Sequence, residues 1–438
     1  MILYTIGTYA MSFSLKIKLF YTISILLSFS IVMLINNFEI ISFKVFQYPK
    51  LLNVAPNIYT SWLLGLCVFL FFTFLVSLFN NKDYLKLWLI KSFVTLIFML
   101  LYEYVYNLDA YMYYARALYI EEVSFFNNAT DNVIMLTKIL SHFVGESFYS
   151  LKITYSLMGF IGLIFFYKCY LYILKKNNIE SFVQKEFMYV LFLFPTIIFW
   201  SSTLGKEPLT LFFVGMFTYN FIKSVDSYNL ENIFFVVLSI IGVTFIRPWW
   251  GVIFTIVIIL SMINFKSKVQ MIIVSLLLPF SFYIIWIILS ARGMTSIDQL
   301  FHHMYLTSTQ MANGNSAIAV NDISTLWGYL YYYIPNLFTT LFRPMFYEVT
   351  NMFTLLSAIE NIILLYLFLR YILFKPIEIL NNKHLRILAI FIFVWSLIYV
   401  IISPTNLGTA VRFKLQILPI ILILVYTTRS IVLMRRSS

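Results

Sequence analysis

Apolar stretches separated by short polar segments run through almost the whole chain. A helix that crosses about 30 Å of hydrocarbon needs ~20 mostly apolar residues, and fewer where side chains at its ends reach the interface. By this criterion the pattern predicts about twelve spans. They are 19–35, 62–79, 87–106, 154–174, 187–201, 208–223, 233–246, 249–265, 269–290, 352–374, 387–402 and 415–428. The sequence therefore predicts an all-α fold, a polytopic transmembrane helical bundle.

One apolar and aromatic segment, 326–348, does not fit a simple span. Pro335 interrupts it, and a proline removes a backbone hydrogen bond that hydrocarbon cannot replace. A further span is one interpretation of this segment, but we favour an interfacial or re-entrant helix on the outer face. With long outer loops at 107–152 and 291–325, residues 1–438 are predicted to form a single integral membrane domain.

Composition excludes the main soluble classes. The chain is 61% hydrophobic and 11% charged, whereas a soluble chain carries about 25% charged residues. So few charges cannot cover the surface of a soluble enzyme, and so apolar a chain is not disordered. The net charge of +12 comes from basic residues spread singly between apolar runs, which argues against nucleic-acid binding. Cys67 and Cys169 both lie within apolar runs, so no disulfide framework or CxxC metal site is predicted.

The basic residues also predict the orientation of the bundle. Lys and Arg resist translocation and hold loops in the cytoplasm. If the N-terminus lies inside and the spans alternate, lysines such as Lys82, Lys86, Lys175 and Lys176 fall on the inner side, where the loops are short, and the tail 429–438 is basic. Both termini are therefore predicted to be cytoplasmic. Residues 1–18 show no cleavable signal pattern, so the first apolar run is expected to be retained.

Five arginines fall on the predicted outer side, against this orientation rule. Arginine carries a planar fork of donors that grips phosphate or carboxylate. An exported set beside polar motifs therefore indicates anion binding, while anchoring in lipid headgroups is the alternative for any one of them. The five are Arg116, Arg247, Arg292, Arg343 and Arg412.

The first candidate motif, 107–116, directly follows the third predicted span. Its carboxylate, Asp109, lies where a helix leaves the membrane, and Tyr113 follows one helical turn later on the same face. Such a carboxylate could act as general base toward a sugar hydroxyl or hold a divalent cation. Asp109 could also cap an interfacial helix that starts at residue 110, and the two roles are compatible.

Two motifs lie between closely spaced spans, which keeps their charges at membrane level. Lys206 and Glu207 either neutralise each other or leave Lys206 to meet a phosphate beside Trp200. Arg247-Pro248 ends one predicted span and starts the next. The tryptophans that follow it are typical interfacial anchors.

Two further motifs lie later in the chain. Arg343 is followed closely by Glu348. The segment 404–414 opens the last span, with Asn406 near its start and the cations Arg412 and Lys414 near its end. Because its glycine allows backbone amides to approach an anion closely, this segment is predicted to bind substrate.

Three other titratable residues are ambiguous or unsuited to a site. Glu360 lies inside a predicted span, where a carboxylate is costly and indicates function; a packed, hydrogen-bonded structural role is the alternative. His302 and His303 are adjacent, which does not put them on one helical face, and no cysteine or HxxxH spacing accompanies them. Zinc is therefore not predicted.

These motifs together resemble known membrane enzymes. Asp109 followed by Tyr113 and Ala115 is similar to the first outer-loop signature of the GT-C glycosyltransferases, although Asp109-Ala110 stands where many of them have an acidic pair. The later motifs resemble those of Wzy-type polymerases of O-antigen and capsule repeat units, although no single very large arginine-rich outer loop is present. The residues that carry this second resemblance are Trp200, Lys206, Glu207, Arg247, Arg343, Glu348, Asn406, Gly408, Thr409 and Arg412.

The resemblance implies a glycosyltransferase of the bacterial inner membrane that acts on undecaprenyl-linked sugars at the extracytoplasmic face. Asp109 would be its catalytic carboxylate, with an expected divalent ion, magnesium or manganese, as a cofactor. Its partners would be undecaprenyl-phosphate- or pyrophosphate-linked glycans, membrane lipids and other polysaccharide-assembly proteins, and no nucleic acid. The residues expected to bind substrate are Tyr113, Arg116, Lys206, Glu207, Arg247, Arg292, Arg343, Glu348, Asn406, Arg412 and Lys414.

Three alternatives to a repeat-unit polymerase remain at this point, one of which is a purely structural partner of a polysaccharide complex, for which the outer cations would be dispensable. A GT-C enzyme that transfers a single sugar from a polyprenyl-phosphate donor fits the same motifs, but the sequence offers no large soluble domain, which favours polymerisation of complete units. A flippase for lipid-linked oligosaccharides should carry charge within its spans. Here few ionisable residues lie mid-span, and the set of five exported arginines falls on one face.

Overall fold

The computed structural model describes residues 58–99, 109–120, 128–179, 184–262, 296–312 and 316–437, with single positions among 102–125 and 279–293. The chain divides into two compact units. Unit 1 comprises Met1–Leu157 with Ser202–Gly205, and unit 2 comprises Met158–Ser201 with Lys206–Ser438. The predicted span 19–35, most of the predicted span 269–290, and Arg292 lie outside the described residues.

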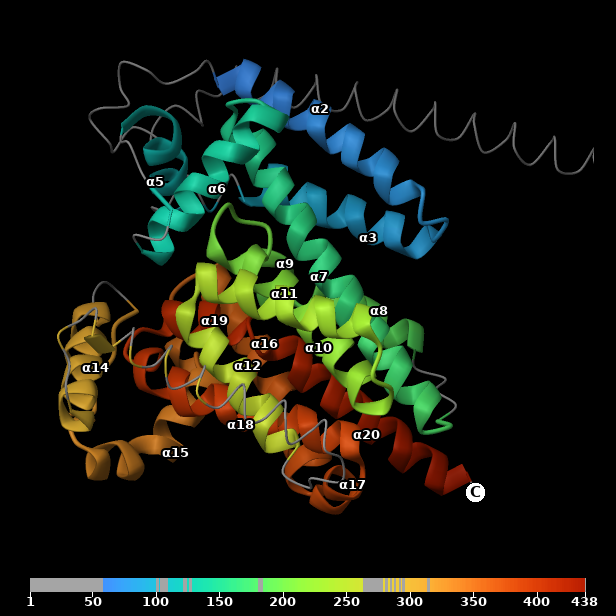
Figure 1. Ribbon diagram of the computed structural model, residues 1–438, viewed down its shortest axis with the longest axis vertical. Coiled ribbons are helices and arrows are strands. Elements are labelled where there is room, and N and C mark those ends of the chain that lie inside the picture. Colours follow the sequence, from blue (N-terminus) through green and yellow to red (C-terminus); the bar gives the residue numbers. More distant parts are fainter. Residues whose placement is uncertain are drawn as a thin grey trace, which may run out of the picture. The chain divides into compact units, whose positions relative to one another are not determined.

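The described part of unit 1 is helical (Figure 1). In chain order its elements are α2 (Ile58–Ser77), α3 (Lys82–Phe93), the π-helical turn η3 (Val94–Phe98), α5 (Asp109–Ala115), the π-helical turn η4 (Arg116–Ile120) and α6 (Ala129–Val144). The long helix α7 (Phe148–Lys176) begins in this unit and continues into unit 2.

Unit 2 contains the larger set of helices, in which α10, α11 and α12 pack in chain order, α12 packs against α18, and α18 packs against α20 (Figure 1). The helices are α8 (Gln184–Leu193), α9 (Pro195–Trp200), α10 (Lys206–Asp226), α11 (Leu230–Ile246), α12 (Pro248–Ser261), α14 (Ile297–Met311), α15 (Leu326–Phe342), α16 (Met352–Phe368), α17 (Pro376–Asn381), α18 (Lys383–Ile402), α19 (Leu407–Lys414) and α20 (Leu418–Ser437). Two short turns, η5 (Phe346–Glu348) and η6 (Leu369–Leu373), flank α16.

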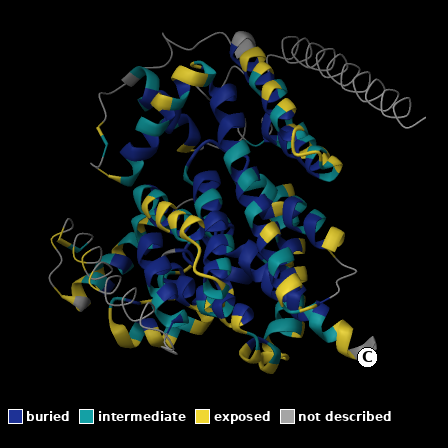
Figure 2. Ribbon diagram, turned by 45° about the vertical axis from the view of Figure 1, so that its right-hand side comes forward, coloured by how far each residue is buried: buried dark blue, intermediate teal, exposed yellow. Residues whose placement is uncertain are grey.

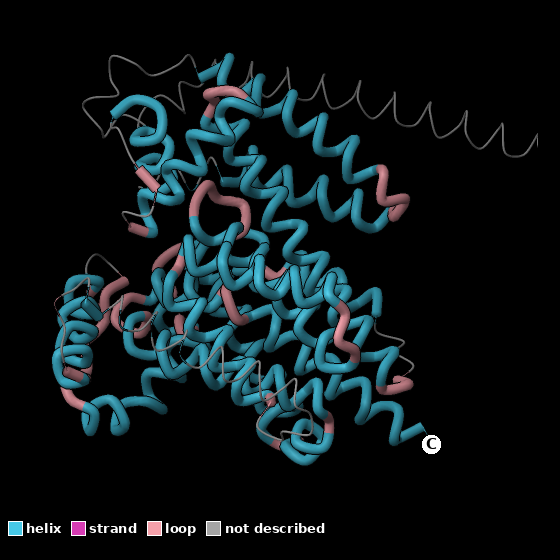
Figure 3. Tube along the Cα trace, in the orientation of Figure 1, coloured by secondary structure: helices cyan, strands magenta, loops and turns pink. Residues whose placement is uncertain are grey.

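Among the described residues, every regular element is helical, which confirms the all-α prediction for this part of the chain (Figure 3). Four helices are long and apolar enough to span a membrane: Phe148–Lys176, Met352–Leu373, Lys383–Ile401 and Leu418–Arg435. Each contains or overlaps a predicted span. Shorter apolar helices at Ser61–Ser77, Leu230–Ile246 and Pro248–Ser261 coincide with three more. The total of about twelve spans stays a prediction.

Exposed apolar side chains on the helix surfaces indicate that these helices face lipid. On α11, the exposed residues Leu230, Phe234, Val237 and Ile241 recur every three or four positions, so they form one stripe along the helix. Along individual helices, exposed positions alternate with buried ones (Figure 2). A continuous exposed apolar stripe is unfavourable in water but is matched by lipid chains. The helices therefore present the surfaces expected of a membrane protein.

Two prolines set where helices begin in unit 2. The predicted span 187–201 is divided into α8 and α9 at Phe194, whose ψ of 125° interrupts the helix, and Pro195 starts the next one. Arg247 is extended, with φ −145° and ψ 90°, between the end of α11 and Pro248 at the start of α12. A proline at the first helical position is favourable because its missing N–H would have no helical partner there. The expected break at Arg247-Pro248 is confirmed, whereas the break at Phe194 was not expected.

Asparagine side chains begin many of the helices. Each accepts hydrogen bonds from backbone N–H groups of the first turn, which otherwise lack a partner. These capping residues are Asn81, Asn128, Asn229, Asn351, Asn382 and Asn406.

Glycine allows α7 and α10 to pack closely within unit 2. A Cβ atom on Gly162 would lie 2.6 Å from the carbonyl oxygen of Leu211, and one on Gly215 would overlap the carbonyl oxygen of Gly162. Small residues at such crossings let two helix backbones approach each other. The middle of α10, whose first turn carries Lys206 and Glu207, is thereby packed directly against the backbone of α7.

Candidate functional site

The centre of the candidate site is Glu207, in the first turn of α10. Its Oε1 atom accepts hydrogen bonds from Nη2 of Arg247 and from Nε of Arg412, each at 2.6 Å. The three residues come from the start of α10, the α11–α12 junction and α19. The sequence-predicted residues Glu207, Arg247 and Arg412 therefore converge, and we call them the arginine cluster.

Aromatic rings hold both guanidinium groups of the arginine cluster. The Arg412 guanidinium carbon lies 5.6 Å from the centroid of the Trp200 ring, and that of Arg247 lies 5.2 Å from the Phe413 ring. Cation–π contacts of this kind stabilise a positive charge and fix the plane of the guanidinium. Trp200 ends α9, whereas Phe413 neighbours Arg412 on α19, so α19 supplies both a cation and a ring.

Exposure differs among the members of the arginine cluster. The Glu207 side chain is 2% exposed, whereas those of Arg247 and Arg412 are 13% and 25% exposed. The carboxylate is therefore enclosed by its partners, while both guanidinium groups keep surface that a ligand can reach. With two arginines and one glutamate the cluster carries a net charge of +1, and the half-buried Lys206 adds a further cation beside it in the chain.

The same contacts keep Glu207 ionised. Burial by itself raises the pKa of the Glu207 carboxyl, but the charges of Arg412 and Arg247 outweigh it and lower this pKa to about 2, from an ordinary value of 4.5. The position in the first turn of α10 also favours negative charge, because the helix dipole is positive there. A carboxylate with so low a pKa is a poor proton acceptor. Glu207 therefore suits the orientation of cations rather than general base catalysis.

Lys414 lies two residues beyond Arg412 and points into the protein interior. Its Nζ atom pairs with Oε1 of Glu360 at 3.0 Å, and both side chains are 0% exposed. Lys414 also donates to Asn361, and the other Glu360 oxygen accepts from the backbone N–H of Thr196. These contacts join α19, which carries Arg412, to α16 and to α9, which ends at Trp200. The geometry therefore favours the structural interpretation of Glu360 and gives Lys414 a role in positioning.

Arg343 is neutralised locally. Its Nε donates to both carboxylate oxygens of Glu348 at 2.9 and 3.1 Å, and its Nη2 forms an ion pair with the same group. Burial alone would raise the pKa of the Glu348 carboxyl, but hydrogen bonds from Arg343 and from the N–H of Met345 lower it overall. Arg343 also lines a cavity formed with α15 and with segment 401–405. Arg343 can therefore donate hydrogen bonds to a ligand, while the Arg343–Glu348 pair as a whole carries no net charge.

Asn406 organises the start of α19. Its Oδ1 accepts from the backbone N–H of Thr409 and from the hydroxyl of Ser316, and its backbone pairs with Ala317. These bonds hold segment 316–318 against the start of the helix that carries Arg412 and Lys414. Asn406, predicted to bind substrate, is here a helix cap.

The three predicted residues of the first outer motif lie in unit 1. Asp109 begins α5 and is exposed, and Tyr113 is buried in the same helix. Arg116 donates to Asp131 at 3.1 Å. Because Arg247 and Arg412 belong to unit 2, the convergence of Asp109 with the arginine cluster stays a prediction.

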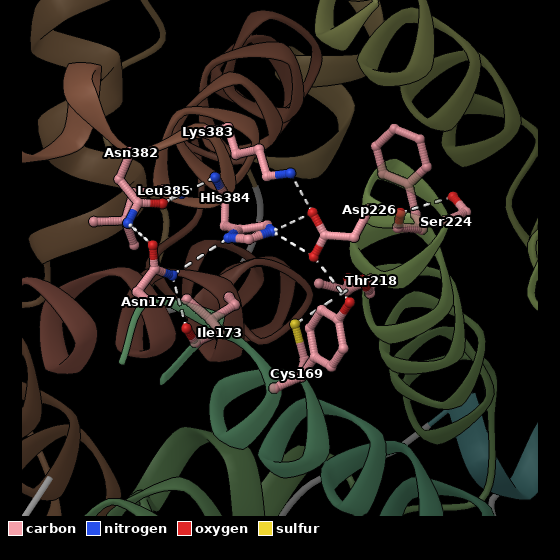
Figure 4. A network of polar contacts seen from close by, with 12 residues as sticks. Cys169, Ile173, Asn177, Thr218, Ser224, Asp226, Asn382, Lys383, His384 and Leu385 are labelled. Carbon is pink, nitrogen blue, oxygen red and sulfur yellow. Dashed lines mark hydrogen bonds and ion pairs between the residues drawn. The ribbon is translucent and has the colours of Figure 1, made fainter. Parts of the chain in front are cut away.

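A second polar cluster lies at the far end of α10, around Asp226 (Figure 4). The Asp226 carboxylate accepts from the hydroxyl of Tyr172 at 2.8 Å, from Nε2 of His384 at 3.1 Å and from Lys383. Asn177 bonds Nδ1 of His384 at 3.4 Å, an arrangement that places the imidazole proton on Nε2. These bonds join α7, α10 and α18. No sequence motif indicated this cluster, because its members are single polar residues at helix ends.

The Asp226 cluster is expected to stabilise the helix bundle rather than to bind a ligand. Burial alone would raise the pKa of the Asp226 carboxyl, but hydrogen bonds from Lys383 and Tyr172 and the nearby His384 lower it overall. Asp226→Asn should therefore lower the free energy of unfolding by about 1–3 kcal/mol, because buried donors lose their charged acceptor. Thermal unfolding in lipid nanodiscs measures this change. As a control, Lys383→Gln removes a half-exposed partner and should cost under about 1 kcal/mol. Equal stability of Asp226→Asn and the parent protein would show that the Asp226 cluster does not stabilise the bundle.

A metal centre is not evident among the described residues, where no three His, Cys, Asp or Glu side chains gather. Glu207 does not suit a divalent cation, because two arginines already occupy its Oε1 atom. The expected magnesium or manganese ion therefore stays a prediction attached to Asp109.

Comparison with known proteins yields no relative. No protein-family model, no curated protein and no solved structure matches the chain.

Proposed function

We propose that this protein is a membrane glycosyltransferase that uses an undecaprenyl-linked oligosaccharide at the extracytoplasmic face of the bacterial inner membrane, in surface-polysaccharide assembly. The observation that carries the proposal is the arginine cluster. Arg247 and Arg412 lie 40 and 205 residues from Glu207 in the chain and bind the same carboxylate oxygen. Such convergence between apolar helices is typical of a site for an anionic headgroup.

A lipid diphosphate matches the charge and geometry of the arginine cluster. The cluster carries a net positive charge, and its guanidinium groups keep exposed surface while Glu207 is enclosed. Arginine binds phosphate oxygens through paired N–H donors. Because Glu207 and the aromatic rings hold the guanidinium planes in place, little reorganisation is needed when charge develops on a leaving diphosphate.

The reaction follows from these roles. A hydroxyl oxygen of the acceptor glycan attacks the anomeric carbon of the donor and forms the new glycosidic bond. The bond between that carbon and the phosphate oxygen breaks, and its electron pair stays on the diphosphate, beside Arg247 and Arg412. The hydroxyl proton passes to a carboxylate, for which Asp109 is our candidate. Loss of one such charge-stabilising donor costs about 2.7–4 kcal/mol of transition-state stabilisation in other enzymes.

A cellular experiment tests the proposal. In a deletion strain complemented with Arg412→Ala or Asp109→Asn at normal protein level, long-chain surface polysaccharide should fall by about 100-fold or more. Arg429→Ala serves as the control, because Arg429 pairs with Glu186 in an exposed contact away from the arginine cluster. Normal polysaccharide in both site variants would overturn the assignment.

The lipid-linked product distinguishes polymerisation from single-sugar transfer. We propose that the protein polymerises repeat units, so the deletion strain should accumulate complete, unpolymerised units on the lipid carrier. Mass spectrometry of extracted lipid-linked glycans measures this. Truncated units would instead indicate transfer of a single sugar.

A further inference from the structure

A second candidate binding site lies in unit 2 as a cavity of about 490 Å³. This volume falls within the range of about 300–1,000 Å³ that is usual for small-molecule sites. Its walls come from residues between 318 and 323, from one side of α15 between Pro335 and Thr339, from Arg343, and from residues between Ile401 and Thr405. None of its lining residues belongs to the arginine cluster.

The walls of this cavity are held in place before any ligand arrives. Ile323 and Ile401 belong to an apolar core cluster with Tyr329 of α15. One hydrogen bond between the hydroxyls of Thr340 and Ser403, at 3.0 Å, joins α15 to the end of α18. The cavity is therefore preformed, as binding sites usually are.

One hydroxyl in the wall of the cavity is buried without a hydrogen-bond partner among the described residues. Thr405 lines the cavity and is 3% exposed, yet its hydroxyl makes no hydrogen bond to any part of the chain that the structure describes. Leaving a buried hydroxyl without a partner is unfavourable. A ligand with its own hydroxyl groups would supply that partner.

The other polar groups of the cavity carry no net charge. The side chains of Asn321 and Asn336 bond to each other at 2.7 Å, and each retains further amide donor or acceptor capacity. The Arg343 guanidinium is compensated by Glu348. A phosphate bound here would face a neutral pair, whereas the arginine cluster offers a net positive charge. The cavity therefore favours a neutral ligand rich in hydroxyl groups.

We propose that this cavity binds one neutral saccharide unit of the glycan substrate. The Thr405 hydroxyl, the Asn321–Asn336 amide pair and the remaining Arg343 donors bind its hydroxyls, and the isoleucine and proline walls contact its C–H groups. This inference rests on the proposed function. Thr405 lies two residues before the start of α19, and Arg412 lies five residues after that start, a helical rise of about 7.5 Å. A sugar joined to a diphosphate spans such a distance.

Binding of methyl glycosides to the purified protein tests the proposal. The probes are the methyl glycosides of glucose, galactose, N-acetylglucosamine and rhamnose, measured by saturation-transfer NMR with the protein in lipid nanodiscs free of glycosidic detergent. At least one should bind the parent protein, and Thr405→Val should weaken that binding about tenfold. Valine keeps the shape of threonine and removes only the buried hydroxyl, so the variant should fold with unchanged or higher thermal stability.

The chain offers a matched control in α20. The hydroxyl of Thr427 is also buried without a hydrogen bond to a described residue, but Thr427 does not line the cavity. Thr427→Val should therefore leave glycoside binding unchanged. Inorganic pyrophosphate should bind Thr405→Val as it binds the parent protein and should not displace the glycoside.

Three results would overturn the proposal: no glycoside binds the parent protein, Thr405→Val binds as the parent does, or pyrophosphate displaces the glycoside. Failure of the proposed function gives a different result. In that case pyrophosphate binding would be insensitive to Arg412→Ala, while the glycoside measurements would still report on the cavity.

Discussion

Replacement of Glu207 by glutamine is expected to destabilise the protein by about 3–5 kcal/mol, because Arg247 and Arg412 then lose the buried carboxylate that they share. Arg247 and Arg412 share one oxygen of this carboxylate, so both lose their fixed orientation in the variant. Polysaccharide formation should fall by about 100–1,000-fold, which is the loss of catalytic rate seen in enzymes that lose a preorganised charge-stabilising group. Thermal unfolding in nanodiscs and the yield of long-chain polysaccharide in complemented cells measure the two effects.

The pH dependence of the free energy of unfolding tests whether the ionised Glu207 carboxylate provides the stability that Glu207→Gln loses. Because its folded pKa is lowered to about 2, Glu207 contributes stability fully above its ordinary pKa of 4.5, and this contribution is lost as the pH falls toward 2. The gap in stability between parent and Glu207→Gln should stay constant from about pH 7 to 5 and narrow below that. Glu186→Gln, in an exposed pair with Arg429, should cost under about 1 kcal/mol. A gap that does not narrow in acid would contradict the account.

Lys414→Met is expected to have the second large effect. It leaves the Glu360 carboxylate without its cation at a position that is 0% exposed, and breaking such a buried pair costs about 3–5 kcal/mol. Because α19 carries Arg412 two residues earlier, polysaccharide formation should fall as well. Thermal unfolding of the variant in nanodiscs measures the loss of stability.

A double variant separates the ion pair from general packing. In Lys414→Met combined with Glu360→Gln, no buried charge remains, and the amide oxygen can still accept the N–H of Thr196. Most of the stability lost in either single variant should therefore return, which gives a coupling energy of about 2 kcal/mol or more in the double-mutant cycle. Purely additive losses would show that Lys414 and Glu360 do not act as a pair.

The sequence predicted the helical architecture and part of the candidate site. Apolar length suffices to predict long helices such as Phe148–Lys176, because a helix satisfies its backbone hydrogen bonds within the segment, where hydrocarbon offers no partner. The cations Arg247 and Arg412 were identified because they break the orientation rule. Their meeting at Glu207 was not predictable, because it depends on how α10 and α19 pack.

Other features depend on tertiary partners that a single sequence does not reveal. Lys414 was predicted to bind substrate, yet it points inward because Glu360 lies on the neighbouring helix α16. The same role stays a prediction for Asn406, whose side-chain oxygen caps α19. The break in the predicted span 187–201 could have been recognised from Pro195, since proline commonly starts a helix. The Asp226 cluster carried no signal, because its residues are far apart in the chain.

The most direct test of the central claim is whether the arginine cluster binds a polyprenyl pyrophosphate. Farnesyl pyrophosphate, a short member of this lipid class, can be titrated into the parent protein and into Arg247→Ala, Arg412→Ala and Arg429→Ala in nanodiscs. We predict that each of the first two variants weakens binding about 30-fold or more, from a loss of about 2 kcal/mol or more per buried charge pair, while Arg429→Ala binds as the parent does. Equal affinity of all four proteins would contradict the account.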